Sequence, residues 1–201
     1  MKMKTMELAL ALAGAAMAQG TYTIDGTHSS AQFSVKHMMI SNVKGEFTAV
    51  AGTLVFDPKN PSASKIDATI DVNSINTREP KRDAHLKSAD FFDAAKYPTM
   101  VFHSKQAWKS GDKIQVKGDL TMHGVTKEVV LDVDGPTAEL KDPWGKLRIG
   151  ATATARLNRK DWGLTWNQAL EAGGVLVGDE VAITLDIEAV KAAPAQQASG
   201  M

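Results

Sequence analysis

The chain has 201 residues, of which 43% are hydrophobic, 23% charged and 6% aromatic, and this globular composition excludes a mainly disordered or collagen-like protein. Lys and Arg number 23, as do Asp and Glu, so the chain lacks the basic excess with which proteins bind nucleic acid. The absence of cysteine excludes disulfides, cysteine-ligated zinc and thiol nucleophiles.

The N-terminus has the pattern of a secretory signal peptide. Lys2 and Lys4 precede an uncharged stretch, residues 8–16, and small residues flank Met17 in Ala16-Met17-Ala18. We therefore expect a signal peptide over residues 1–18, cleaved after Ala18. A helical N-terminal arm is the alternative. The apolar stretch is shorter than the ~20 residues of a spanning helix, so stable membrane insertion is not expected.

Strands with one apolar and one polar face dominate the rest of the chain. The apolar residues alternate with polar ones in residues 31–36, and the same period of two recurs in residues 65–72, 113–122 and 181–189. This alternation is typical of antiparallel sheets with one buried face. Ser110-Gly111-Asp112 predicts a hairpin turn between two strands.

Residues 44–56 change phase partway along. The apolar residues Phe47 and Leu54 lie on opposite parities, with Ala51-Gly52 between them. We interpret this as a β-bulge at Ala51-Gly52 that keeps both halves facing the core. Two strands joined by a tight turn is the alternative.

Residues 78–88 form the one segment that predicts a helix. The segment is polar, has no β-branched residue and contains Pro80 near its start. Asn76 or Thr77 is the expected N-cap. At the end of the chain, residues 191–201 are of low complexity and predict a disordered tail after a domain that spans residues 19–190.

About eight strands without a βαβ rhythm indicate an antiparallel barrel or sandwich. Residues 147–157 alone would extend about 36 Å at ~3.3 Å per residue. One face of this segment carries Ala151, Ala153 and Ala155 in succession, where a packed core usually has larger side chains. Either large residues from the opposite wall fill this space or a ligand does, and the long strands favour a ligand.

Four segments carry motifs: residues 82–93 (RDAHLKSADFFD), 120–127 (LTMHGVTK), 158–164 (NRKDWGL) and the opening residues 22–36. These segments resemble the signatures of the YceI-like polyisoprenoid-binding family. The resemblance spans about residues 22–190. It implies an all-β protein, an extended eight-stranded antiparallel lipocalin-like β-barrel with one short helix.

The resemblance also implies a periplasmic or secreted homodimer that holds a polyisoprenoid or isoprenoid quinone in its barrel. Candidate ligand-binding residues combine inward strand positions with aromatic residues of the family motifs: Phe33, Val35, Phe47, Leu54, Phe56, Ile70, Phe91, Phe92, Leu120, Met122, Ile149, Ala151, Ala153, Leu157 and Trp162. Arg82 and His85 are candidates for a polar head group. For Arg82 we favour an ion-paired corner with Arg159 and Asp161.

No catalytic or metal-ligating residue is predicted. The five histidines form no His-x-His or His-x-x-x-His pair, and no nucleophile-elbow, P-loop or dinucleotide-binding motif occurs. Asp83 and His85 are two residues apart, a spacing at which helical side chains do not face each other. No cofactor is expected besides the bound lipid.

Three functions remain open at this stage. The first is a non-enzymatic lipid carrier, which we favour because burying a long apolar chain is worth ~0.8 kcal/mol per methylene. The second is an isomerase or cyclase acting on a prenyl substrate, with His85 or His123 as the base. The third is a structural or stress-related protein whose tunnel is incidental.

Overall fold

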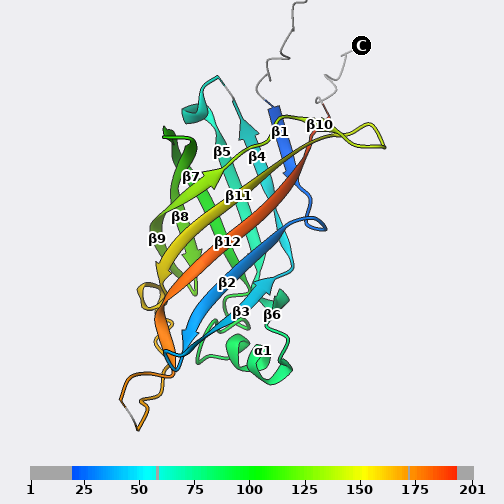
Figure 1. The fold of residues 1–201 in the computed structure, drawn as a ribbon. Helices are drawn as coiled ribbons and strands as arrows, with labels where there is room; N and C mark the ends of the chain where they lie inside the picture. Colours follow the sequence, from blue (N-terminus) through cyan, green and yellow to red (C-terminus); the bar gives the residue numbers. More distant parts are fainter. Residues whose placement is uncertain (1–19, 58, 172, 194–201) are drawn as a thin grey trace, which may run out of the picture.

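The structure is a computed structural model that describes residues 20–57, 59–171 and 173–193 (Figure 1). Its strands form one antiparallel sheet that closes into a barrel, as the sequence predicts. The predicted signal peptide lies outside the described residues. The barrel strands follow one another around the ring in this order: β1 (Gly20–Ile24), β4 (Val50–Phe56), β5 (Lys65–Asp71), β7 (Thr99–Ser110), β8 (Lys113–Met122), β9 (Val125–Asp134), β11 (Leu147–Asn158) and β12 (Val177–Lys191).

Two neighbouring strand pairs differ greatly in length. β11 pairs with β12 continuously from Arg148 to Asn158, and this pairing closes the ring. On its other side β11 pairs with β9 only from Thr152 to Thr154.

The predicted turn between residues 110 and 112 joins β7 to β8, with Gly111 in the left-handed region at φ 63°.

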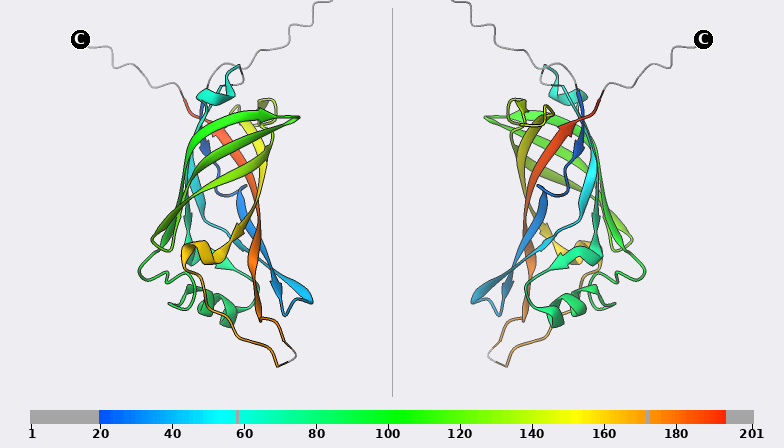
Figure 2. Two further views of the ribbon diagram at one scale, coloured as in Figure 1. Left: turned by 90° about the vertical axis from the view of Figure 1, so that its left-hand side faces the viewer. Right: turned by 90° about the vertical axis from the view of Figure 1, so that its right-hand side faces the viewer.

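β12 is long enough to serve two partners along one edge. Its last residues pair with β1, and its earlier ones pair with β2 (Ser30–His37). β2 leads through a hairpin to β3 (Ser41–Phe47), which pairs with β6 (Ile75–Asn76). These strands and helix α1 (Pro80–Lys87) lie at the lower end of the barrel as drawn in Figure 1, and Figure 2 shows α1 there from both sides.

The remaining short elements lie at the turns. They are η1 (Pro61–Ala63), η2 (Val72–Ser74), β10 (Leu140–Lys141) and η3 (Arg159–Trp162). β1 begins and β12 ends at the upper end of the barrel, where β10 also lies (Figure 1). No helix within the described part of the chain is both long and apolar enough to span a bilayer.

The predicted bulge at Ala51-Gly52 is wrong. The chain breaks instead at Thr48-Ala49, between β3 and β4, which pair with different neighbours and not with each other. Ser74 holds the two residues between these strands by hydrogen bonds. Its carbonyl accepts from the Thr48 amide at 3.3 Å, and its Oγ accepts from the Ala49 amide. Glycine is required at position 52 for a different reason. A Cβ on Gly52 would lie 2.3 Å from the Asp67 carbonyl oxygen of β5.

The predicted helix over residues 78–88 is confirmed, but its N-cap is neither Asn76 nor Thr77. Glu79 caps it by accepting from the Lys81 amide at 3.0 Å. The Thr77 hydroxyl is already engaged, because it donates to Asp83 Oδ1 at 2.5 Å. The Asn76 amide oxygen accepts from the Arg78 amide at 2.9 Å.

The predicted start of the C-terminal tail at residue 191 is wrong. Lys191 is the last residue of β12 and pairs with Tyr22 of β1. Its Nζ lies 2.6 Å from Glu139 Oε1, and the same carboxylate accepts from the Tyr22 hydroxyl. Because this buried tyrosine and an ion pair hold it, the strand runs past the predicted boundary. Residues 194–201 lie outside the described part.

A packed core fills the lower end of the barrel, and hydrogen bonds from the buried Arg159 stabilise it. Trp162 is 2% exposed and its indole donates to the Leu120 carbonyl at 3.1 Å. Arg159 is 5% exposed, and its guanidinium donates to the carbonyls of Leu164, Trp166 (3.0 Å) and Gly178 (2.9 Å). Asp179 lies 3.4 Å from Nη2. One buried cation therefore ties η3, the following loop and the start of β12 together.

Arg159→Met should destabilise the protein by at least about 3 kcal/mol, because it leaves several buried carbonyls without donors. Arg156→Met is the matched control, since Arg156 is 70% exposed and, within the described part of the chain, pairs with exposed Glu180 alone. That change should cost less than about 1 kcal/mol. Urea unfolding of both variants measures the difference, and equal losses would show that Arg159 is not a brace.

Candidate ligand cavity

The barrel encloses a cavity of about 300 Å³ whose wall is almost wholly apolar. Four polar residues reach this wall, and each already has a partner within the protein. Gln32 donates to Asp186, the hydroxyls of Ser64 and Ser104 accept backbone amides, and Arg159 binds carbonyls. The cavity therefore offers its contents mainly apolar contact and few hydrogen-bonding groups.

The alanines of β11 account for part of the empty space. Ala151, Ala153 and Ala155 all line the cavity and pair with Ile187, Leu185 and Ile183 of β12, which line it too. The neighbouring strand thus supplies large side chains while β11 supplies methyl groups. Three methyl groups thus form this part of the cavity wall, and we call the space beside them the hollow along β11.

Most candidate ligand-binding residues lie in the cavity wall. The wall contains Phe33, Val35, Phe47, Leu54, Phe56, Ile70, Phe91, Phe92, Leu120, Met122, Ala151, Ala153 and Leu157. Ile149 and Trp162 do not belong to it: Ile149 packs with Tyr22, Phe56 and Ala189, and Trp162 belongs to the lower core. That the wall residues contact a ligand stays a prediction.

Sequence reasoning missed other wall residues that its own signal contained. Ile66 and Ala68 alternate with Ile70 on β5, and Ile183, Leu185 and Ile187 do so on β12. Their parity alone would have found them. Pro61, Leu86 and Pro136 also line the cavity, but they come from turns and α1, where no period of two exists.

The two head-group candidates lie outside the cavity wall. Arg82 is held by Thr77, to which its Nε and Nη2 donate at 2.8 Å each. His85 Nε2 lies 2.8 Å from Asp90 Oδ2, and its ring packs edge-on against Trp166. These polar groups fasten α1 and the segment after it.

The expected ion-paired corner of Arg82, Arg159 and Asp161 does not form among the described residues, since Arg159 uses carbonyls and Asp179 instead. His123, the other candidate base, lies 3.0 Å through Nδ1 from the Trp162 carbonyl and packs against Tyr97. It does not line the cavity. The loop motifs that contain these residues thus hold the lower end together.

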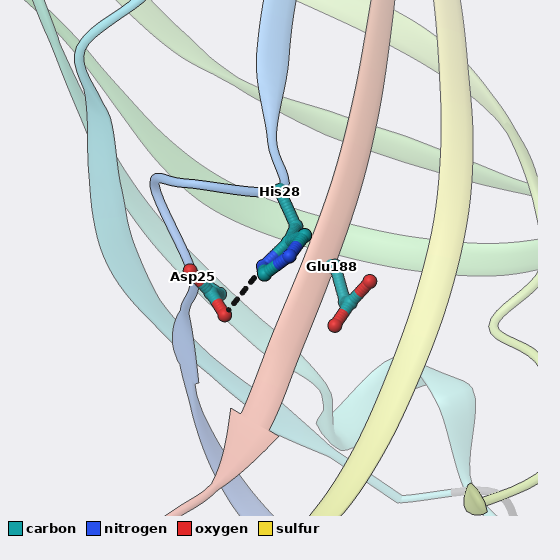
Figure 3. A group of neighbouring side chains, drawn as sticks. All are labelled: Asp25, His28 and Glu188. Carbon is teal, nitrogen blue, oxygen red and sulfur yellow. Dashed lines mark hydrogen bonds and ion pairs between the residues drawn. The ribbon is translucent and has the colours of Figure 1, made fainter. Parts of the chain in front are cut away.

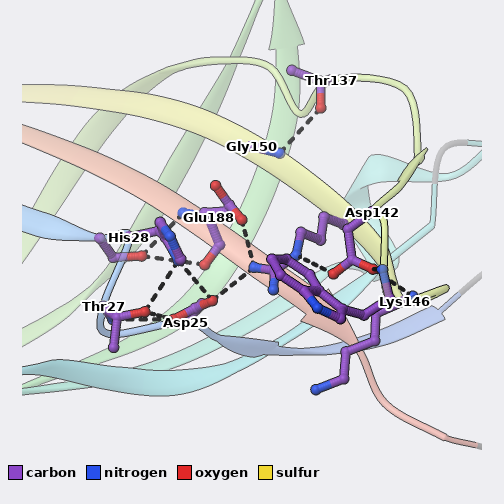
Figure 4. Close-up of polar contacts among 11 residues, drawn as sticks. Asp25, Thr27, His28, Thr137, Asp142, Lys146, Gly150 and Glu188 are labelled. Carbon is purple, nitrogen blue, oxygen red and sulfur yellow. Dashed lines mark hydrogen bonds and ion pairs between the residues drawn. The ribbon is translucent and has the colours of Figure 1, made fainter.

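One group of carboxylates and a histidine outside the barrel is close enough to share a cation. Figure 3 shows Asp25, His28 and Glu188 gathered beside β12. Arg148 already lies between them: its Nη1 is 2.7 Å from Asp25 Oδ2 and 2.6 Å from Glu188 Oε1, and its Nε is 2.8 Å from Asp142 Oδ2. Figure 4 shows this network, in which the guanidinium supplies the positive charge that a metal ion would supply.

Hydrogen bonds in this network shift the pKa values of its charged side chains. Those from Thr27, then Arg148 and His28, hold the pKa of the Asp25 carboxyl below its ordinary value. Arg148 also lowers the pKa of Asp142, and the carboxylates raise the pKa of Arg148. The charged forms are thereby favoured at neutral pH.

A closed antiparallel barrel around an apolar cavity is a lipocalin-like architecture. The YceI-like domain family matches residues 22–189. Protein YceI of Escherichia coli O157:H7 is 41% identical over 154 residues, which cover 76% of this chain and 80% of that protein. The chain belongs to the YceI-like family.

Two solved structures agree with this assignment. The Campylobacter jejuni YCEI protein is 35% identical, with a TM-score of 0.65 over 79% of this chain and 90% of that one. A polyisoprenoid binding domain from Saccharophagus degradans is only 16% identical but shares the fold, with a TM-score of 0.61 over 85% of this chain and 98% of that one.

Acid should weaken the wild type through Asp25 and Asp142. A lowered pKa in the folded state stabilises the protein fully above the unfolded pKa of about 3.9, and this contribution is lost progressively as pH falls from there through the folded-state pKa. Arg148→Met should lower stability at pH 7 and flatten its decline toward pH 3, as both pKa values return toward normal. Urea midpoints at pH 7, 4 and 3 test this, with Arg156→Met as control. Parallel pH profiles for wild type and Arg148→Met would contradict it.

Proposed function

We propose that the protein binds a long-chain isoprenoid lipid, a polyisoprenoid or an isoprenoid quinone, inside the barrel and serves as a carrier or store. The observation that carries the proposal is the cavity, whose wall is apolar and whose few polar groups all have protein partners. The Saccharophagus degradans domain, named for polyisoprenoid binding, supports the same class of ligand.

A slender branched hydrocarbon matches this wall better than a polar metabolite. Each methylene buried gains ~0.8 kcal/mol, whereas a polar group buried without a hydrogen bond costs ~1–3 kcal/mol. Met100 and Met122 line the cavity and add flexible side chains that adapt to an irregular chain. The walls thus favour length and apolarity over any particular head group.

The geometry favours a carrier over an enzyme acting on a prenyl substrate. Neither candidate base, His85 or His123, lines the cavity, and their ring nitrogens contact Asp90 and the Trp162 carbonyl. A base must reach the proton that it removes. A purely structural or stress-related role would leave the hollow along β11 without a use, so we place it after the carrier.

Extraction of the purified protein with organic solvent, followed by mass spectrometry, tests the proposal. A prenyl chain or isoprenoid quinone in near-stoichiometric amount is the expected result. An extract that contains only bulk phospholipid, or nothing, from protein that also fails to take up added isoprenoid would overturn it. A prenyl compound altered on incubation would instead favour the enzyme.

Ala153→Phe should block the cavity while leaving the fold intact. The ring would enter the hollow along β11, so retained lipid should fall severalfold while the delipidated protein keeps a near-normal melting temperature. In a filled core the same change would cost about 1–3 kcal/mol through overpacking. Thr154→Phe is the matched control, because Thr154 is the adjacent residue on the exposed outer face. Wild-type lipid retention by Ala153→Phe, or a melting temperature many degrees lower, would count against the cavity.

We further propose that the protein is exported to the periplasm or beyond and forms a homodimer. The signal pattern before Gln19 supports export, and the family resemblance supports the dimer. The intact mass of exported protein should correspond to a chain that begins at Gln19, and light scattering at micromolar concentration should give twice that mass. A retained Met1 in the exported fraction, or a monomer mass, would reject the respective proposal.

A further inference from the structure

The lower end of the barrel carries an exposed apolar tip. Seven large hydrophobic side chains are exposed among the described residues, and four of them lie here: Met38 (40% exposed), Met39 (58%) and Ile40 (80%) in the β2–β3 hairpin, and Val175 (37%) in the neighbouring loop. The Met38 amide donates to the Leu176 carbonyl at 2.8 Å and so joins the hairpin to that loop. We call Met38, Met39, Ile40 and Val175 the apolar tip.

The hairpin holds these side chains outward in a fixed turn. Met38 and Met39 have φ values of 51° and 61°, in the left-handed region that Gly and Asn adopt more readily. The Ile40 amide closes the turn by donating to the His37 carbonyl at 3.1 Å. Within the described chain nothing covers the tip. Two methionines and an isoleucine therefore project from a turn where small polar residues are usual.

The charges within residues 31–45, which contain the hairpin, are of one sign. Residues 31–45 contain Lys36, His37 and Lys44 and no Asp or Glu. Both lysines are exposed, and neither forms an ion pair within the described part of the chain. The carboxylates nearest to Val175 along the chain are Glu171 and Asp179, and Asp179 pairs with Lys160 at 2.8 Å and with Arg159. An apolar tip flanked by unpaired lysines complements a surface with an outer anionic layer and an apolar layer below it.

We propose that the apolar tip docks the barrel reversibly onto an anionic phospholipid bilayer. Met39 and Ile40 enter the level of the head groups and upper acyl chains, while Lys36 and Lys44 meet lipid phosphates. A second copy of the chain is a poorer occupant, because it would bring together four lysines that have no ion-pair partner among the described residues of their own chains.

Docking here would bring the bilayer to the cavity. Val35 of β2 lines the cavity three residues before Met38, and Val177 lines it two residues after Val175. Loading or release of a lipid through this end rests on the proposed function. The docking itself depends only on the tip and its charges.

The absence of cysteine allows a position-specific test on the full chain. Ser41→Cys places a single environment-sensitive dye beside the tip, and Asp112→Cys places the same dye in the β7–β8 turn at the opposite end (Figure 1). On vesicles of equal parts phosphatidylglycerol and phosphatidylcholine, the dye at Ser41 should shift to the blue and be quenched by lipid-borne quenchers. The dye at Asp112 should not respond.

Two sets of variants separate the apolar and charged parts. Met39→Ser/Ile40→Ser should weaken partitioning about tenfold or more on anionic vesicles. Trp144→Ser is the matched control: it removes an equally exposed side chain (81%) near β10, at the upper end, and should change nothing. Lys36→Gln/Lys44→Gln should weaken binding about tenfold on anionic vesicles and leave the weaker binding to pure phosphatidylcholine unchanged.

Several results would overturn the proposal. One is an unshifted dye at Ser41 on a chain that sediments with vesicles, because attachment would then run through another segment such as residues 8–16. Another is a shift that grows with protein concentration without lipid, which would show that the tip meets a second copy. Wild-type partitioning by Met39→Ser/Ile40→Ser would also reject it. Because the vesicles contain no isoprenoid, these outcomes do not depend on the cavity, and solvent extraction reports on the cavity without the tip.

Discussion

The backbone pairing of β11 with β12 is the constraint on which the rest of the structure depends. It joins the two ends of the ring over the whole stretch from Arg148 to Asn158. Once the ring is closed, every apolar strand face points into the same space, and no barrel edge needs covering. The register of this pairing also places the alanines of β11 beside large residues of β12, so closure and the hollow along β11 have one origin.

Polar interactions hold the two ends of the tube and leave its middle apolar. At the lower end Arg159 satisfies the carbonyls of three loop and strand residues, and at the upper end Glu139 joins Tyr22 to Lys191. Arg148 gathers Asp25, Asp142 and Glu188 on the outside. The loops are thus fixed by charges and amides, most of which lie outside the cavity, and the cavity wall is almost wholly apolar.

Alternation predicts which strand faces point inward, because a period of two survives in any antiparallel sheet with one dry face. Most of the candidate wall residues follow from it. It could not distinguish a bulge at Gly52 from a break at Thr48, because both reverse parity, and only the change of pairing partner separates them. Capping by Glu79 was missed because Thr77 and Asn76, which are more usual capping residues, bind Asp83 and the Arg78 amide instead. Arg82 and His85 bind Thr77 and Asp90, each five residues away, at a spacing that no helical or strand period predicts. Ile149 and Trp162 lie outside the cavity wall for a related reason: an apolar residue that packs against neighbouring side chains looks the same in sequence as one that faces a void.

The short seam between β9 and β11 gives the wall an uneven resistance to opening. Only Thr152–Thr154 pair across it, so parting these strands breaks far fewer backbone hydrogen bonds than parting β11 from β12. Amide protons on the facing edges beside this seam will therefore exchange with solvent sooner than those of the β11–β12 ladder. The diameter of the barrel can therefore change where β9 meets β11. The pairing of β11 with β12 on the other side stays intact.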